Sequence, residues 1–127
     1  MRHYKKEEGT HMLFVEYPKC STCRKAKQWL KDNGIDFTDR DITVQNPTGQ
    51  ELRQWQAGSG LPLRKFFNTS GQLYKSLHLK EKLSAMSEEE QIALLASDGM
   101  LVKRPIVVAG GTVLVGFRSA EWEQALK

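Results

Sequence analysis

The sequence has few cysteines and no long hydrophobic run. Only 2 of its 127 residues are cysteine, which excludes the disulfide-rich scaffolds of small secreted proteins. No apolar stretch approaches the roughly 20 residues that span a bilayer, and none is typical of a secretion signal. We therefore expect a cytoplasmic protein that does not associate with membranes. With 39% hydrophobic and 27% charged residues, the composition is typical of one globular domain.

The sequence also has few histidines and no strong excess of either charge. The first 11 residues are polar and end like an expression-vector junction, so we expect residues 1–11 to be an added, disordered segment and the domain to span residues 12–127. Without that segment His78 is the only histidine. The net charge of +4 falls to +3, because three basic and two acidic residues are removed. The remaining basic residues alternate with acidic ones, so we expect no direct binding of nucleic acid.

The N-terminal third has the pattern of a βαβ unit. An apolar strand at Leu13–Val15 is followed from Ser21 by a helical pattern, which ends at Gly34 in a left-handed cap. Residues Ile35–Ile42 then alternate partially, as a strand does. A strand, a helix and a strand in succession predict two parallel strands with a right-handed crossover.

The rest of the chain predicts a helical insertion and then a ββα unit. Residues 46–100 are mostly helical in pattern, with one helix closing near Gly58 and another running from a Ser87–Glu90 capping box to Gly99. Two β-rich runs around a Gly-Gly pair then predict a hairpin, and a helix capped by Ser119 follows. We therefore predict an α/β domain of the order βαβ, helical insertion, ββα.

The two cysteines, Cys20 and Cys23, form a C-S-T-C motif where the first strand gives way to the first helix. Backbone N–H groups at a helix N-terminus favour negative charge, and Lys19 and Arg24 add positive charge on either side. Both effects stabilise a thiolate over a thiol. Cys20 is thus predicted to be a nucleophile, and Cys23 can resolve a mixed disulfide formed on Cys20.

Other interpretations of the cysteine pair carry less weight. Zinc needs about four ligands, and one C-x-x-C with the distant His78 does not supply them, so no metal is expected. A stable structural disulfide is disfavoured in the cytosol. Two inert, buried thiols are the main alternative. A C-x-x-C at the start of a βα unit is nevertheless a thioredoxin-like redox signature.

The Arg104-Pro105 pair precedes the strand that begins at residue 106. A trans proline that merely marks a boundary is the commoner case. In a thioredoxin-like arrangement, however, the proline before this strand is typically cis and faces the reactive cysteine. Arg104 would then hold an oxyanion or a glutathione carboxylate. A solvated charge is the other interpretation.

Several segments together resemble the arsenate reductase family. They are Y-P-K-C-S-T-C-R-K-A-K, L-R-K-F-F-N-T-S-G, D-G-M-L-V-K-R-P-I-V-V and L-V-G-F. This is the thioredoxin-fold group of glutaredoxin-linked arsenate reductases together with the Spx-type transcriptional regulators. The resemblance covers the chain from Met12 to Leu126. It implies a thioredoxin-like core with an inserted helical subdomain and a cis bond before Pro105.

The chain departs from the arsenate-reducing members at several positions. Those enzymes carry a histidine and an asparagine where this chain has Glu16 and Tyr17. Of their three oxyanion-binding arginines only Arg104 is kept, because the second aligns with Asn68 and the third near Gly116. These changes predict arsenate binding weaker by several kcal/mol. Arg118, two positions beyond Gly116, remains a candidate replacement.

The Spx-type regulators share the C-x-x-C followed by R-K-A. They switch a disulfide there and contact RNA polymerase. Against that role, their central segment differs, and they usually extend beyond the last helix. We therefore expect a thiol-dependent oxidoreductase that exchanges disulfides or reduces a small substrate. The alternatives are an Spx-like regulator that binds RNA polymerase and a true arsenate reductase supplied by glutaredoxin or glutathione.

The expected site combines the C-S-T-C motif with the Arg104-Pro105 pair. Its catalytic residues are Cys20, Cys23 and Arg104, and its substrate-binding residues are Ser21, Thr22, Arg24, Pro105, Asn68 and Arg118. No bound cofactor is expected, and glutathione, glutaredoxin or thioredoxin would act as the reductant. The expected substrate is a small thiol, a disulfide or an oxyanion.

Overall fold

The computed structural model describes residues 12–127, so the prediction made for residues 1–11 lies outside it. The described chain forms two compact units. One contains the residues up to Asp41 and from Arg104 to Lys127, and the other contains Ile42–Lys103. The sequence suggested residues 46–100 for the inserted part. In the part of the chain described here, no helix has the length and apolar character needed to cross a bilayer.

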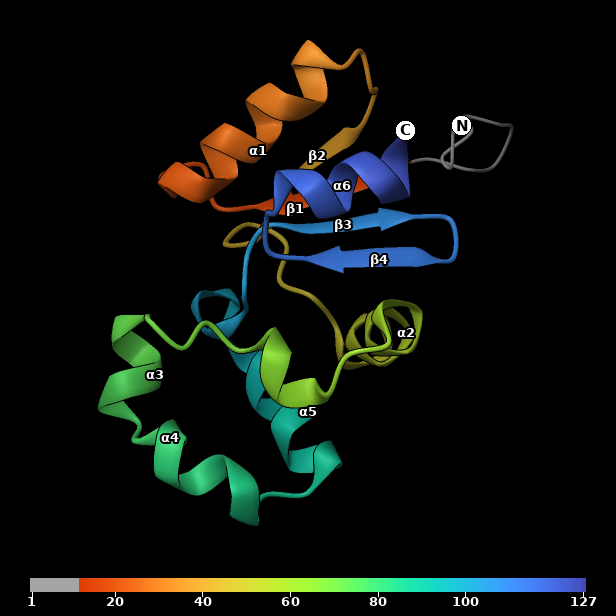
Figure 1. Cartoon of the computed structure of the whole chain (residues 1–127). Helices are drawn as coiled ribbons and strands as arrows, with labels where there is room; N and C mark the ends of the chain where they lie inside the picture. The colour runs from red at the N-terminus through yellow and green to blue at the C-terminus, as the bar shows by residue number, and fades with distance from the viewer. Residues whose placement is uncertain (1–11) are drawn as a thin grey trace. The chain divides into compact units, whose positions relative to one another are not determined.

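The first unit is a four-stranded mixed sheet with two helices. Its elements are β1 (Met12–Glu16), α1 (Ser21–Asp32), β2 (Thr38–Asp41), β3 (Ile106–Ala109), β4 (Thr112–Val115) and α6 (Ser119–Leu126). The strand order is β2-β1-β3-β4, with β1 parallel to β2 and antiparallel to β3 (Figure 1). The predicted βαβ unit, with its parallel strands, is confirmed, and so is the hairpin between β3 and β4.

Apolar side chains from the sheet and both helices form the core of this unit. Alternation along β1 places Met12 and Phe14 on one face of the sheet. The cluster on that face consists of Met12, Phe14, Ala26, Leu30, Val107, Ala109, Leu114, Trp122 and Leu126. Because α1 contributes Ala26 and Leu30, and α6 contributes Trp122 and Leu126, both helices pack on the face that also carries Glu16 at the end of β1.

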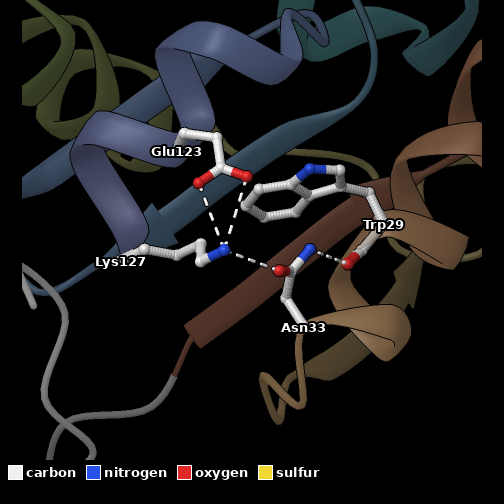
Figure 2. A network of polar contacts seen from close by, with 4 residues as sticks. All are labelled: Trp29, Asn33, Glu123 and Lys127. Atoms are coloured by element: carbon white, nitrogen blue, oxygen red, sulfur yellow. Dashed lines mark hydrogen bonds and ion pairs between the residues drawn. The ribbon is translucent and has the colours of Figure 1, made fainter.

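The C-terminal ends of α1 and α6 are joined by polar contacts (Figure 2). Lys127 Nζ donates to Asn33 Oδ1 at 2.9 Å and pairs with Glu123, while Asn33 Nδ2 donates to the carbonyl of Trp29 at 2.8 Å. These groups are largely exposed, so each contact contributes little free energy. The apolar packing of α1 and α6 on the sheet, rather than this network, therefore holds the two helices in place.

Two predicted boundaries in this unit are wrong by a few residues. The second strand begins at Thr38 rather than Ile35, because the Ile35 N–H still bonds to the Leu30 carbonyl at the end of α1. The predicted cap of the last helix, Ser119, is its first residue, and Arg118 occupies the N-cap position.

The second unit is helical. It contains α2 (Gly49–Ser59), η1 (Leu63–Phe66), α3 (Gln72–Ser76), α4 (Leu79–Lys82), η2 (Leu83–Ala85), α5 (Glu88–Ser97) and η3 (Gly99–Leu101). The predicted Ser87–Glu90 capping box at the start of α5 is confirmed. The helix predicted to close near Gly58 closes two residues later, at the left-handed residue Gly60.

Gly99 has a different role from the predicted helix stop. Asp98 is the C-cap of α5, and Gly99 opens η3 instead. A Cβ atom on Gly99 would lie 2.6 Å from the backbone oxygen of Ile42 and 2.7 Å from Asn46 Oδ1. Glycine is therefore required here by the close approach of another segment, which no local pattern reveals.

Gly99→Ala is expected to destabilise the protein by about 1–3 kcal/mol, because the backbone oxygen of Ile42 has to move. Chemical denaturation measures the free energy of unfolding. Gly111→Ala is the matched control, since a Cβ atom there meets nothing within 4 Å. Equal stability of the two variants would contradict the proposed close packing at Gly99.

Candidate functional site

The two cysteines lie at the junction between β1 and α1. Cys20 is the N-cap residue of α1, with extended backbone angles, and Cys23 lies in the first turn. Cys20 is partly exposed, whereas Cys23 is fully buried, and the two are not joined by a disulfide. The position predicted for the motif is thus confirmed. One sulfur is accessible to a partner, and the other lies behind it.

The surroundings of Cys20 favour the thiolate. Partial burial raises the pKa of Cys20, but the backbone N–H and the thiol of Cys23, the backbone N–H of Thr22 and the charge of Arg104 together lower it below the ordinary value of 9.0. The side chain of Cys20 makes no conventional capping hydrogen bond. The N–H groups of the first turn nevertheless lower the pKa of Cys20 through their orientation toward the sulfur at the helix N-terminus.

Cys23 has the opposite environment. Burial raises the pKa of Cys23 to about 12, assisted by the neighbouring Cys20, although a backbone hydrogen bond from Tyr17 and the charge of Arg104 lower it. Cys23 therefore stays a thiol at neutral pH and donates toward the Cys20 sulfur. The pair is polarised, with the anionic form on the accessible residue.

Arg104 is the positive charge that acts on both sulfurs. Its guanidinium carbon lies 5.2 Å from the centre of the Tyr17 ring, an arrangement that orients the cation over the aromatic face. The Arg104–Pro105 peptide bond is cis, as the resemblance implies. The Pro105 carbonyl accepts the Gly116 N–H at 2.8 Å.

Arg104→Ala is expected to raise the pKa of Cys20, because the attraction between the guanidinium and the thiolate is lost. Alkylation of Cys20 should become slower at neutral pH and stay unchanged at alkaline pH, where the thiol is ionised in both proteins. Arg118→Ala is the control, since Arg118 is exposed at the start of α6. A rate at neutral pH unaffected by loss of Arg104 would refute the electrostatic role.

The other residues expected around Cys20 have distinct positions. Ser21 and Thr22 are exposed in the first turn of α1, and of the two it is the Thr22 N–H that acts on the Cys20 sulfur. Arg24 Nε donates to the Pro18 carbonyl at 3.1 Å, so this guanidinium holds the loop before the cysteines. The charged side chain named as lowering the pKa of Cys20 is Arg104, and the electrostatic role of Lys19 and Arg24 stays a prediction.

Asn68 belongs to the helical unit. Its backbone N–H bonds to the Leu101 carbonyl at 2.8 Å, and its side-chain oxygen accepts a hydrogen bond from Ser70 at 3.3 Å. These contacts organise the turn after η1. Within residues 12–127, no group of three or more metal-binding side chains is arranged to hold an ion.

Two residues that the sequence marked only as departures have structural roles at the cysteines. Tyr17 contributes its ring to Arg104 and its backbone to Cys23. Glu16 is buried beside Lys27 and Asp39. The signal for Glu16 was its charge within an otherwise apolar strand. No signal linked Tyr17 to Arg104, because the pairing depends on the fold.

Curated relatives cover most of this chain. The YusI protein of Bacillus subtilis is 52% identical over 113 residues, which are 89% of this chain and 96% of that protein. The regulatory protein MgsR of the same organism is 31% identical over 87% of this chain and 86% of its own. The global transcriptional regulator Spx 2 of Bacillus anthracis is 26% identical over 80% of this chain and 76% of its own.

Solved structures of similar proteins have the same fold. One, from Bacteroides fragilis and related to the ArsC family, is 57% identical with a TM-score of 0.89, covering 93% of this chain and 99% of its own. Another is described as a possible arsenate reductase of Streptococcus mutans UA159. It is 48% identical with a TM-score of 0.83, covering 91% of this chain and 98% of its own. The family model of the ArsC family matches residues 15–125. The chain therefore belongs to the ArsC family and has its thioredoxin-like α/β fold.

Proposed function

We propose that this protein is a thiol–disulfide oxidoreductase in which Cys20 attacks and Cys23 resolves. The observation that carries the proposal is the polarised pair, with a partly exposed Cys20 of lowered pKa beside a buried Cys23 thiol. A reactive thiolate next to a protected second thiol suits the two steps of disulfide exchange.

In the first step the Cys20 thiolate attacks one sulfur of a disulfide. A bond forms between Cys20 and that sulfur, the substrate disulfide breaks, and the other half leaves as a thiolate. In the second step Cys23 loses its proton to solvent or to the departed thiolate and attacks Cys20. The Cys20–Cys23 disulfide forms, and the second half of the substrate leaves with the electron pair of the broken bond.

Two electrons from two glutathione molecules or from one dithiol protein complete the cycle. Glutathione, glutaredoxin or thioredoxin can reduce the Cys20–Cys23 disulfide by the same exchange chemistry, and each belongs to the reducing cytosol. The two sulfurs carry the electrons themselves, so the proposed cycle has no step for a bound cofactor. Arg104 stabilises the thiolate of Cys20 and attracts anionic substrates.

Arsenate reduction is a weaker candidate. The resemblance to a possible arsenate reductase supports it, and Arg104 is present. A buried carboxyl group at Glu16 and an uncharged Asn68 replace residues that the arsenate-reducing members use, and an oxyanion needs positive charge. We therefore favour disulfide substrates over arsenate.

A redox-sensing regulator is the second candidate function, favoured by the likeness to MgsR and Spx 2. In that role the same disulfide would form once and change a surface recognised by RNA polymerase. The chemistry at Cys20 and Cys23 is identical in both roles. The difference lies in how many times one molecule reacts.

Turnover of a small disulfide distinguishes the two candidates. With excess glutathione as the reductant, an oxidoreductase reduces many equivalents of substrate per molecule, and Cys20→Ser abolishes the reaction. A sensor consumes one equivalent and stops, which would overturn the proposal in favour of the regulator. Capture of RNA polymerase by the oxidised form alone would likewise favour the regulator.

A further inference from the structure

A buried carboxyl group, Glu16, lies shortly before the cysteine motif beside the more exposed carboxyl group of Asp39, and neither is used in the steps above. Glu16, the last residue of β1, is 2% exposed. Lys27 Nζ lies 2.6 Å from Glu16 Oε2 and 2.7 Å from Asp39 Oδ2, so one ammonium group holds both carboxyl groups. Two carboxylates beside a single ammonium group leave one negative charge uncompensated, which favours a proton on the more buried of the two.

The charged side chains around Glu16 come from α1 and β2. Lys27 comes from α1 and Asp39 from β2, and Asp41 on β2 acts on Asp39. The strand on the other side of β1 is β3, whose residues Ile106–Ala109 are all apolar. From α6 the buried side chains are also apolar. The protonation of the cluster is therefore governed by Glu16, Asp39 and Lys27, while Asp41, the register partner of Glu16 on β2, adds negative charge beside them.

The cluster is connected to Cys23 through two short routes. Along the chain, Glu16 precedes Tyr17, whose backbone bonds to the Cys23 sulfur and whose carbonyl accepts the Cys20 N–H at 2.9 Å. Along the helix, Lys27 is four residues after Cys23 and so lies on the same face of α1. The contacts of Lys27 therefore fix the face of α1 that carries Cys23 against the end of β1.

We propose that Glu16, Lys27 and Asp39 form a proton-sharing clamp that positions the buried Cys23 thiol for its attack on Cys20. This role rests on the proposed exchange function and concerns its second step alone. The three are positioning residues, because they act through the β1–α1 junction and not on the reacting sulfurs. The pKa of Cys20 is also lowered by the N–H groups of the first turn and by Arg104, so we expect loss of the clamp to affect the first step less than the second.

The clamp changes state near neutral pH. Burial, with the hydrogen bond to Asp39, raises the pKa of Glu16 from 4.5 to about 7. Above that pH Glu16 ionises, two carboxylates face each other, and the single charge of Lys27 neutralises only one of them. The clamp then loosens. In the unfolded chain Glu16 ionises near pH 4.5, so stability decreases as pH rises from about 4.5 to about 7.

An aromatic disulfide with a coloured thiol product separates the two steps. The first equivalent of colour reports the attack by Cys20, and the second reports the resolution by Cys23. Lys27→Met is expected to slow the second step by roughly tenfold to a hundredfold, since small misplacements of reacting groups have effects of this size. Lys31→Met, one turn further along α1 at an exposed position, is the control and should leave both steps unchanged.

Glu16→Gln tests the role of the proton without removing the contacts, and it covers the case in which Lys27→Met fails to fold. The amide donates to Asp39 and accepts from Lys27 at every pH. The second step of the original protein should show an inflection near pH 7 that this variant lacks, and the loss of stability between pH 4.5 and 7 should disappear as well.

The outcomes separate the clamp from the exchange function. If the first equivalent of colour appears and the rate of the second step is the same in the original protein and in folded Lys27→Met, the clamp is refuted. The exchange function is not affected by that result. An inflection near pH 7 retained in Glu16→Gln would refute the role of its proton. Absence of the first equivalent in the original protein would instead refute the exchange function.

Discussion

Cys20→Ser is expected to reduce disulfide exchange to the uncatalysed rate, whereas Cys23→Ser retains the first step and accumulates a mixed disulfide. The lowered pKa of Cys20 and the pKa of about 12 for Cys23 give the physical reason. At neutral pH the thiolate fraction is therefore far larger for Cys20 than for Cys23, and a serine hydroxyl does not ionise there. Mass spectrometry detects the mixed disulfide as an added half of the substrate.

The matched pair of serine variants also tests which sulfur attacks. If Cys20→Ser formed the mixed disulfide and Cys23→Ser did not, the assignment of the two sulfurs would be reversed. Equal activity of both variants would mean that the motif serves packing. Near-identical unfolding curves are the control that both variants fold.

Trp122→Ala is expected to destabilise the protein by about 3–5 kcal/mol. Trp122 is fully buried, stacks edge-on against Trp29 and Phe117, and donates from Nε1 to the Gly116 carbonyl at 3.2 Å. Removal leaves a large cavity under α6 and an unpaired buried carbonyl. Chemical denaturation followed by circular dichroism measures the change in the free energy of unfolding.

Trp29→Ala is the matched control for this prediction. Trp29 is only partly buried and contacts the same two rings, so its loss exposes less apolar surface and leaves no deep cavity. We expect its effect to be clearly smaller than that of Trp122→Ala. A larger effect at Trp29 would contradict the assignment of Trp122 to the centre of the core.

Local patterns predicted the elements that place the reactive cysteine. The start of α1 at Ser21, its end before Gly34 and the β3–β4 hairpin all depend on residues adjacent in sequence. The position of Cys20 at the helix N-terminus followed directly. The family resemblance supplied the cis bond before Pro105, which local chemistry alone left open.

Features that depend on distant contacts were not predictable in the same way. The second strand is shorter than its alternation suggests, because pairing with β1 begins only at Thr38. Gly99 is required by the approach of Ile42 rather than by a helix end. The contact between Arg104 and Tyr17 joins segments far apart in sequence. Periodicity and capping rules contain no information about such pairs.

The redox midpoint of the Cys20–Cys23 pair tests the central claim most directly. The protein is equilibrated in graded glutathione buffers, its free thiols are trapped, and they are counted by mass. The proposed exchange function predicts a midpoint between about −270 and −180 mV, the range of exchange-active dithiols. A pair that never closes in any buffer would contradict the account, because Cys23 could not then resolve a disulfide on Cys20.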